Sequence, residues 1–309
     1  MDGAGAAGGL SLLILSLAGS TVRLAAPLVL AALAGLYAER SGVIDIGLEG
    51  KMLAAAFAGA AFGIAAWNCC NRRRRRSDRI GHGTQPDCRG CHTEPRFGMV
   101  RAARHDAALA ERGALRSDRM PLAQSLSEVP ILGRVYTTVI SGYSLPVYLA
   151  WLAVPLTAFV LARTRFGLRL WAVCESPEAV AAAGLSVARL RLGALAVNGA
   201  LCGLAGVCLS MAQGNGFLRD MSAGRGYLAL AALIFGKWRP WPVLGACLLF
   251  AAADAVQVRL QGAILPGIGT VPVQLIQALP YLITVAILAG FVGTARPPRA
   301  LGKPYLPAG

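Results

Sequence analysis

The sequence has few charged residues for its length. Only 15% of its 309 residues are Asp, Glu, Lys or Arg, whereas 56% are hydrophobic. Soluble domains usually hold about 25% charged and about 45–50% apolar residues. This balance argues against an ordinary water-soluble fold and predicts a chain whose surface faces lipid. It has room for several membrane helices of about 20 residues each and little chain left for a separate soluble domain.

Acidic residues are scarce as well. There are 15 Asp and Glu against 30 Lys and Arg, which gives a net charge of +15. In a soluble protein this excess would indicate nucleic acid, but here the basic residues lie between apolar stretches, where the positive-inside rule places them. We therefore expect contact with membrane lipid and no nucleic-acid partner. Only three of the basic residues are lysines, a skew that fits a GC-rich coding sequence.

The nucleotide-binding pattern G-x-x-x-x-G-K-[ST] is missing from the sequence. The chain is therefore not expected to hydrolyse ATP by that route. We expect no enzymatic activity, no cofactor and no bound metal. Four cysteines lie singly in or beside apolar stretches, where Cys behaves as a small buried hydrophobe: Cys174, Cys202, Cys208 and Cys247.

Apolar stretches that could form membrane helices lie on both sides of a polar segment. Several are short or contain Gly and Pro, which membrane depth tolerates only where the backbone faces protein or a water-filled cavity. We therefore predict an all-α polytopic membrane protein with about six to eight transmembrane helices that line a transport route. The candidate spans are Leu10–Tyr37, Met52–Trp67, Leu145–Ala162, Leu192–Gln213, Tyr227–Phe235, Val243–Val258 and Val273–Val292.

The basic connections predict the orientation of the helices. Arginines in residues 163–191 and basic residues after position 295 place both segments in the cytoplasm. Lys237 and Arg239 fall on the same side if each intervening apolar stretch crosses once. The predicted organisation is thus N-terminal membrane helices in residues 1–67 and C-terminal membrane helices in residues 128–309, with a cytoplasmic loop at 163–191.

Residues 68–127 are an irregular arginine-rich insertion in this pattern. They hold 13 arginines and all three histidines, and no apolar stretch long enough to span. The sequence Cys88-Arg-Gly-Cys91-His92 matches the attachment pattern of c-type haem, which would suit a membrane-bound electron carrier. However, the segment offers few hydrophobic residues to bury haem, and a zinc cluster with Cys69 and Cys70 would have irregular spacing.

Two further interpretations of this segment remain open. Arg72–Arg76 could lie as a solvated basic loop on an anionic membrane surface. Alternatively, residues 68 to about 118 could be translated out of frame, because a shifted frame of GC-rich DNA gives Arg, Ala, Gly, Pro, Cys and His without periodicity. We favour the frame-shift interpretation.

Several long motifs resemble those of a known family. They are similar to the nucleoside and simple-sugar permeases of bacterial ABC importers, a group related to ribose and branched-chain amino-acid permeases. The resemblance covers residues ~20–67 and ~128–305, whereas the family would have further apolar helices in place of 68–127. The matching motifs are Glu39–Gly50, Arg165–Ser186, Gln213–Phe217 and Gly224–Pro240.

The resemblance implies a function, a location and partners. The chain would be the permease subunit of an importer for nucleosides or simple sugars in the cell inner membrane, with branched-chain amino acids as the alternative solute. Its partners would be an ABC ATPase subunit, a second permease subunit and an extracytoplasmic solute-binding protein. ATP binding in the ATPase would switch the side to which the pore opens.

The loop at 163–191 contains a short predicted helix. Ser176 is suited to cap it, Pro177 to occupy its first turn and Gly184 to end it, while Glu178 suits the positive end of the helix dipole. The family resemblance implies that this helix docks on the ATPase, so the candidate coupling residues are Glu175, Pro177, Glu178 and Gly184. Without the resemblance, an ordinary amphipathic connector would explain the pattern.

Polar residues between apolar stretches are candidates for the solute path. Asp45 and Glu49 are four residues apart, a spacing that would put both on one helix face, and carboxylates at membrane depth suggest function. Capping of a re-entrant helix is an equal alternative. Gln213, Asn215 and Phe217 combine amides and a ring that could contact a sugar or base, although an interfacial turn is the commoner explanation. Two weaker candidates are Asp254 and Gln257.

Overall fold

The computed structural model describes the chain in several ranges: residues 3–61, 143–213, 217–218, 221–260, 264–265, 269–270, 278, 282 and 297–303. The predictions made for residues 68–127 and for Asn215, and most of the span predicted at Val273–Val292, lie outside these ranges. The regular secondary structure of the described part is helical apart from one antiparallel pair of two-residue strands, β1 (Ile264–Leu265) and β2 (Gly269–Thr270). The predicted all-α class is confirmed.

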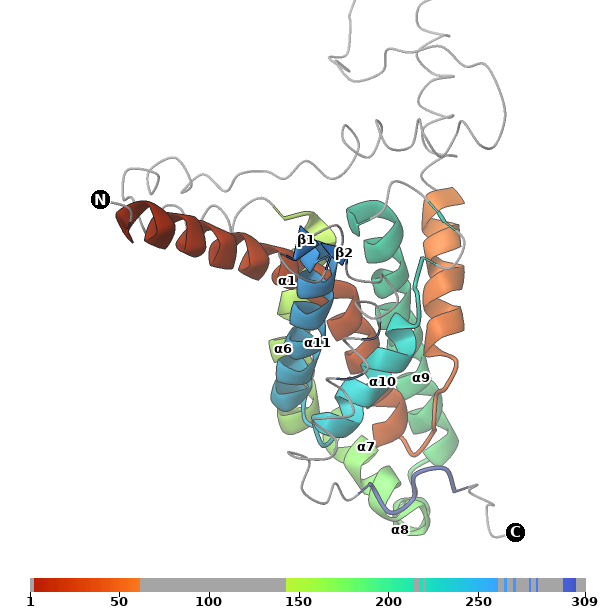
Figure 1. Ribbon diagram of the computed structural model, residues 1–309. Helices are drawn as coiled ribbons and strands as arrows, with labels where there is room; N and C mark the ends of the chain where they lie inside the picture. Colours follow the sequence, from red (N-terminus) through yellow and green to blue (C-terminus); the bar gives the residue numbers. More distant parts are fainter. Residues whose placement is uncertain are drawn as a thin grey trace, which may run out of the picture.

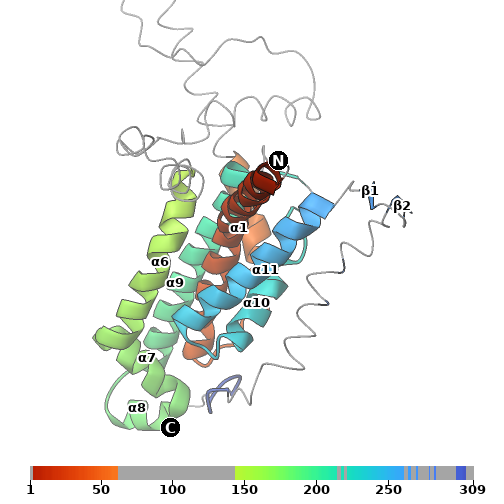
Figure 2. The ribbon, with the colours of Figure 1, turned by 60° about the vertical axis from the view of Figure 1, so that its left-hand side comes forward.

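Helix α1 (Gly3–Arg40) runs through the centre of the bundle (Figure 1). At 1.5 Å per residue its 38 residues extend for about 57 Å. From Ala25 to Arg40 nearly every side chain is buried, and a helix that is apolar on all sides is expected to lie inside a bundle. The N-terminal part of α1 leaves the bundle and projects sideways (Figures 1 and 2).

Four helical stretches in the described part are long and apolar enough to cross a membrane: Ile14–Arg40, Leu145–Arg163, Val187–Gln213 and Pro240–Leu260. They correspond to α1, α6 (Leu145–Arg163), α9 (Val187–Val207) with its π-helical extension η2 (Cys208–Gln213), and α11 (Pro240–Leu260). On α6, Leu149, Leu152, Leu156 and Phe159 are exposed, which is the pattern of a helix face in contact with lipid. The four spans confirm a multi-pass membrane protein.

Two further helical stretches lie in the described part of the bundle. Helix α10 (Arg225–Phe235) has 11 residues and measures about 16 Å, half of the ~30 Å needed to cross the hydrocarbon. A helix at residues 48–61, orange in Figure 1, packs against α9. A Cβ atom on Gly206 of α9 would lie 2.4 Å from the Met52 carbonyl oxygen, so this close packing requires glycine.

The predicted cytoplasmic segments share one end of the bundle, where α7 (Arg165–Glu175) and α8 (Pro177–Ala182) lie (Figure 2). The Ala300 N–H donates to the Cys174 carbonyl at 2.9 Å, and the Gly302 N–H donates to the Gly42 carbonyl at 3.0 Å. The end of α1, α7 and residues 297–303 are therefore joined by backbone hydrogen bonds. We call this end of the bundle the base.

Candidate functional site

The carboxylate of Glu49 binds the beginning of α10. Its two oxygens accept hydrogen bonds from the Gly224 N–H at 3.0 Å and the Gly226 N–H at 2.6 Å. Helix N-termini leave N–H groups without intrahelical partners, and a negative charge there is favoured by the helix dipole. Gly224, at φ +78°, has no side chain that could cap the helix. Glu49 therefore caps α10 from another helix.

Arg225 and Gln213 connect three elements beside this cap. The Arg225 guanidinium donates to the Gln213 side-chain carbonyl at 2.9 Å, and the Gln213 amide donates to the Arg23 carbonyl of α1 at 2.6 Å. Gln213 lies in η2, and π-helical turns are frequent at functional sites. We define the inner cluster as Glu49, Gln213, Gly224, Arg225 and Gly226. It joins two of the predicted path residues, Glu49 and Gln213.

Sequence reasoning did not single out Arg225. The signal was present, because one arginine lies between two glycines immediately before an apolar stretch. Charged residues at membrane depth are rare and usually face a partner or a cavity. Asp254 of α11, a weaker candidate from the sequence, lies within electrostatic range of Arg225.

Asp45 belongs to a different group of polar residues. Its carboxylate lies 2.6 Å from the Lys51 ammonium, which also donates to the Asn198 side-chain carbonyl at 3.1 Å. Asn198 is fully buried in α9 and donates to the Ala34 carbonyl at 2.8 Å. The helix begins at residue 48, so Asp45 precedes it. The prediction that Asp45 and Glu49 share one helix face is therefore wrong.

Phe217 contacts the helix at residues 48–61. Its ring meets that of Phe57 edge-to-face, with 5.4 Å between the centroids. Both rings are partly exposed, Phe57 at 59% and Phe217 at 37%. The two rings therefore form an exposed aromatic surface. Because Phe57 and Phe217 are 160 positions apart, sequence spacing alone does not predict their contact.

A second set of polar side chains lies at the base. Arg40, the last residue of α1, donates to the Trp238 carbonyl at 2.7 Å, and its guanidinium lies 4.0 Å from the ring centroid of Trp171 in α7. Glu39 accepts a hydrogen bond from the Trp238 indole N–H, and its carbonyl accepts one from the Cys174 thiol at 3.2 Å. We call Glu39, Arg40, Trp171 and Trp238 the basal cluster.

The base also carries a helical hairpin formed by α7 and α8, which we call the coupling hairpin. Ser176 occupies the N-cap position of α8, as predicted, but its side chain makes no capping hydrogen bond. Gly184 ends α8 at φ +78°, and the Leu185 N–H donates back to the Val180 carbonyl at 3.2 Å. This is the Schellman arrangement, so the predicted stop at Gly184 is confirmed.

The remaining candidate coupling residues lie on the surface of the hairpin. Glu178 is exposed in the first turn of α8, and Pro177 begins that helix. Glu175 lies 4.0 Å from the Arg299 guanidinium, and both side chains are largely exposed. An ion pair of this kind contributes little to stability. These residues are therefore accessible to a partner at the base.

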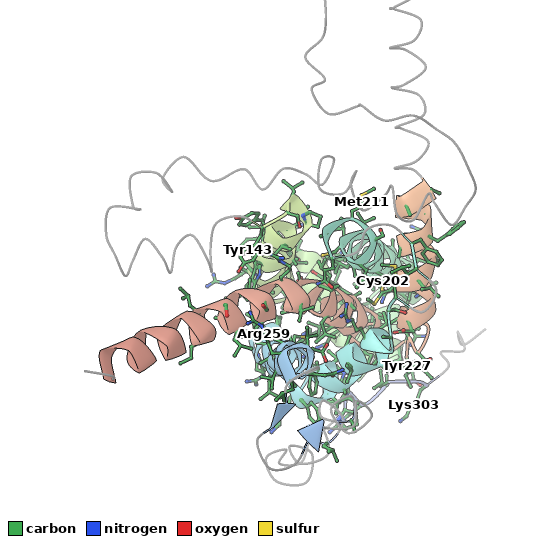
Figure 3. All side chains as sticks on the ribbon, turned by 45° about the horizontal axis from the view of Figure 1, so that its top comes forward. Tyr143, Cys202, Met211, Tyr227, Arg259 and Lys303 are labelled. Atoms are coloured by element: carbon green, nitrogen blue, oxygen red, sulfur yellow. The ribbon has the colours of Figure 1, made fainter. Side chains whose placement is uncertain are left out.

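The four single cysteines are buried and free, as predicted. Burial raises the pKa of the Cys174 thiol to about 11, so this thiol remains protonated and unreactive at neutral pH. Within the described residues, no group of three or more His, Cys, Asp or Glu side chains could hold a metal ion. Cys202 lies inside the bundle on α9 (Figure 3).

Comparison with known proteins identifies the family. Residues 119–288 match the model of the family described as the permease component of a branched-chain amino acid transport system. The chain belongs to this permease family. Its four described spans and its membership place the permease in the cell inner membrane as a multi-pass protein. No solved structure matches the permease.

Individual relatives match over most of their length. The permease is 31% identical to the guanosine ABC transporter permease protein NupQ of Bacillus subtilis, over 93% of this chain and 95% of the relative. It is 30% identical to the nucleoside ABC transporter permease protein NupC of Lactococcus lactis, over 91% and 93% of the two chains. It is 29% identical to the putative glucose ABC transporter permease protein TsgC13 of Haloferax volcanii, over 87% and 89%.

Proposed function

We propose that the permease forms the membrane path of an ABC importer for nucleosides. The supporting observation is its similarity, at 30% identity or more and over nearly the whole length, to a guanosine permease and a nucleoside permease. The chain contributes a selective path and no bond-breaking chemistry. Its partners would be an ATPase, a second permease subunit and an extracytoplasmic solute-binding protein.

The inner cluster and the Phe57–Phe217 pair supply groups that suit a nucleoside. A nucleoside that leaves water needs hydrogen-bond partners for its hydroxyl and base groups, and Arg225 and Gln213 provide donors and an acceptor. An aromatic edge or face can contact the base. We propose a solute path that includes Glu49, Gln213, Asn215 and Phe217, with Asp45 closer to the base.

The coupling hairpin is the proposed contact with the ATPase. Its outer surface presents Glu175, Pro177 and Glu178 beside the end of α8 at Gly184. On its inner side, Val180 of α8 packs with Val173 of α7 and Val187 of α9. A force applied to α8 would therefore be passed to α7 and α9 through a packed apolar contact.

Transport in proteoliposomes tests the solute. Vesicles would contain the permease, its ATPase and second permease subunit, with the solute-binding protein outside, and uptake of labelled guanosine would be measured. We expect ATP-dependent uptake that unlabelled nucleosides inhibit and that glucose and leucine leave unchanged. Leucine is included because the family description names branched-chain amino acids. Uptake of leucine without any uptake of nucleosides would reject the proposal.

A further inference from the structure

We propose that α10 is a lever between the coupling hairpin and the inner cluster, and that Arg40 is the positioning residue at its basal end. The proposal rests on the function proposed above, because it assumes that the hairpin receives the movement of an ATPase. Each end of α10 is fixed by charged side chains, and the two ends contact different functional parts of the permease.

The basal end of α10 is joined to the hairpin through Arg40. After α10, the chain turns at Lys237 and Trp238, which have positive φ angles of 49° and 55°. Such angles are unfavourable for residues other than glycine and persist only when neighbouring groups impose them. Here Arg40 binds the Trp238 carbonyl, and the Trp238 indole is bound by Glu39.

Arg40 also lies against the ring of Trp171, 4.0 Å from its centroid. A cation over an indole ring is attracted by the negative face of the ring. Among the described residues, the Arg40 Nε has no hydrogen-bond partner. The guanidinium is thus held by the Trp238 carbonyl and the Trp171 ring, so a shift of α7 would displace Arg40 and the turn after α10.

The other end of α10 enters the inner cluster. Its first N–H groups bind Glu49, and Arg225 binds Gln213. A Cβ atom on Gly226 would lie 2.7 Å from the backbone nitrogen of Glu49, so the two helices meet with no space between them. Any displacement of α10 along its axis would therefore move these contacts.

The helix itself is suited to transmit displacement. Leu228, Ala229, Ala232 and Leu233 are buried in the core, and Phe235 packs against Phe250 of α11 with 5.7 Å between the centroids. A continuous α-helix in a close-packed core moves as a unit, because such cores are hardly compressible. A displacement of the turn at Trp238 would thus reach Gly224 at the other end of this helix, which is about 16 Å long.

The test is a double-mutant cycle on the complete importer. Arg40→Lys keeps the charge and removes the planar guanidinium, and Glu49→Gln keeps the size and removes the charge. The measured quantity is the number of solute molecules imported per ATP hydrolysed, with guanosine as the solute. Thermal unfolding and co-purification of the ATPase are measured for every variant, because a merely structural defect would change them.

We expect Arg40→Lys alone to lower the transport ratio at least threefold, with the ATPase still bound and hydrolysing ATP. The double variant should lose much less than the product of the two single effects, because both changes interrupt one lever. Residues that lie more than 7–10 Å apart and share no partner normally give additive effects. Arg259→Lys is the matched control, since this exposed arginine lies beside the projecting part of α1 and donates to Ser16 at 3.0 Å (Figure 3).

The proposal would be overturned if the effects of Arg40→Lys and Glu49→Gln on the transport ratio were independent, or if Arg40→Lys had a normal transport ratio. If Arg40→Lys does not fold, Trp171→Leu removes the ring at the other side of the same contact, and the same threefold loss is expected. Absence of guanosine uptake by the unaltered importer would instead reject the proposed solute, and the cycle would then be measured with leucine. The failure of each proposal is therefore distinguishable.

Discussion

Replacing Glu49 with Gln tests whether this residue caps α10 or contacts solute. The amide keeps one acceptor oxygen, but its NH₂ group would face the N–H of either Gly224 or Gly226. The loss of one hydrogen bond to a charged group costs about 1.5–3 kcal/mol, and the loss of the charge at the helix N-terminus adds about 0.3–1 kcal/mol. We therefore expect the free energy needed to open the first turn of α10 to fall by about 3 kcal/mol.

Amide hydrogen exchange measures this effect directly. A loss of about 3 kcal/mol corresponds to exchange that is faster by about 100-fold, because 1.4 kcal/mol is a factor of ten. The acceleration should be confined to the first turn of α10. Glu178→Gln is the matched control, since Glu178 is exposed and lies on α8. Unchanged exchange at Gly224 and Gly226, together with reduced uptake, would refute the cap and assign Glu49 to the solute.

Four further predictions can each be tested by one measurement. Gly206→Ala should lower the free energy of unfolding by about 1–3 kcal/mol, because its Cβ would meet the helix at 48–61. Gly203→Ala, also on α9, is the control, since its Cβ meets nothing within 4 Å and the change should be neutral or stabilising. Equal stabilities of the two variants would contradict this packing. Glu178→Arg should leave the permease in the membrane and prevent co-purification of the ATPase, and normal uptake would reject the coupling assignment. Cys174 should not react with maleimide at pH 7–8 until the protein unfolds, because its pKa is about 11, and rapid labelling of the folded protein would disprove its burial. Translation of the DNA for residues 68–127 in the other two frames should give apolar stretches of membrane-helix length, and their absence would reject the frame shift.

The spans could be predicted from sequence because lipid restricts the possibilities. A helix that crosses the membrane satisfies its own backbone hydrogen bonds, so it appears as a continuous apolar stretch of fixed length. The prediction of Leu145–Ala162 differs from α6 by one residue, and Val243–Val258 lies within α11. The α8 helix was equally readable, because Pro177 and Gly184 are local signals for its beginning and end.

The candidate site was less predictable because its contacts are distant in the sequence. Glu49 binds Gly226, which is 177 residues away, and Lys51 binds Asn198, which is 147 residues away. Spacing shows which residues could share a helix face, but it cannot show where a helix begins. For that reason the four-residue spacing predicts Asp45 on the helix face of Glu49, whereas the helix starts after Asp45.

The beginning of α10 nevertheless carries a constraint that the sequence shows. Where water cannot reach the start of a helix in a membrane protein, each N–H group left unpaired costs several kcal/mol. The sequence Gly224-Arg225-Gly226 has no Ser, Thr, Asp or Asn to cap the helix. An acceptor therefore had to come from another part of the chain, and the carboxylate of Glu49 supplies it. The absence of a local cap thus predicts a remote one, and it makes the contact between Glu49 and α10 a condition for any solute path built beside it.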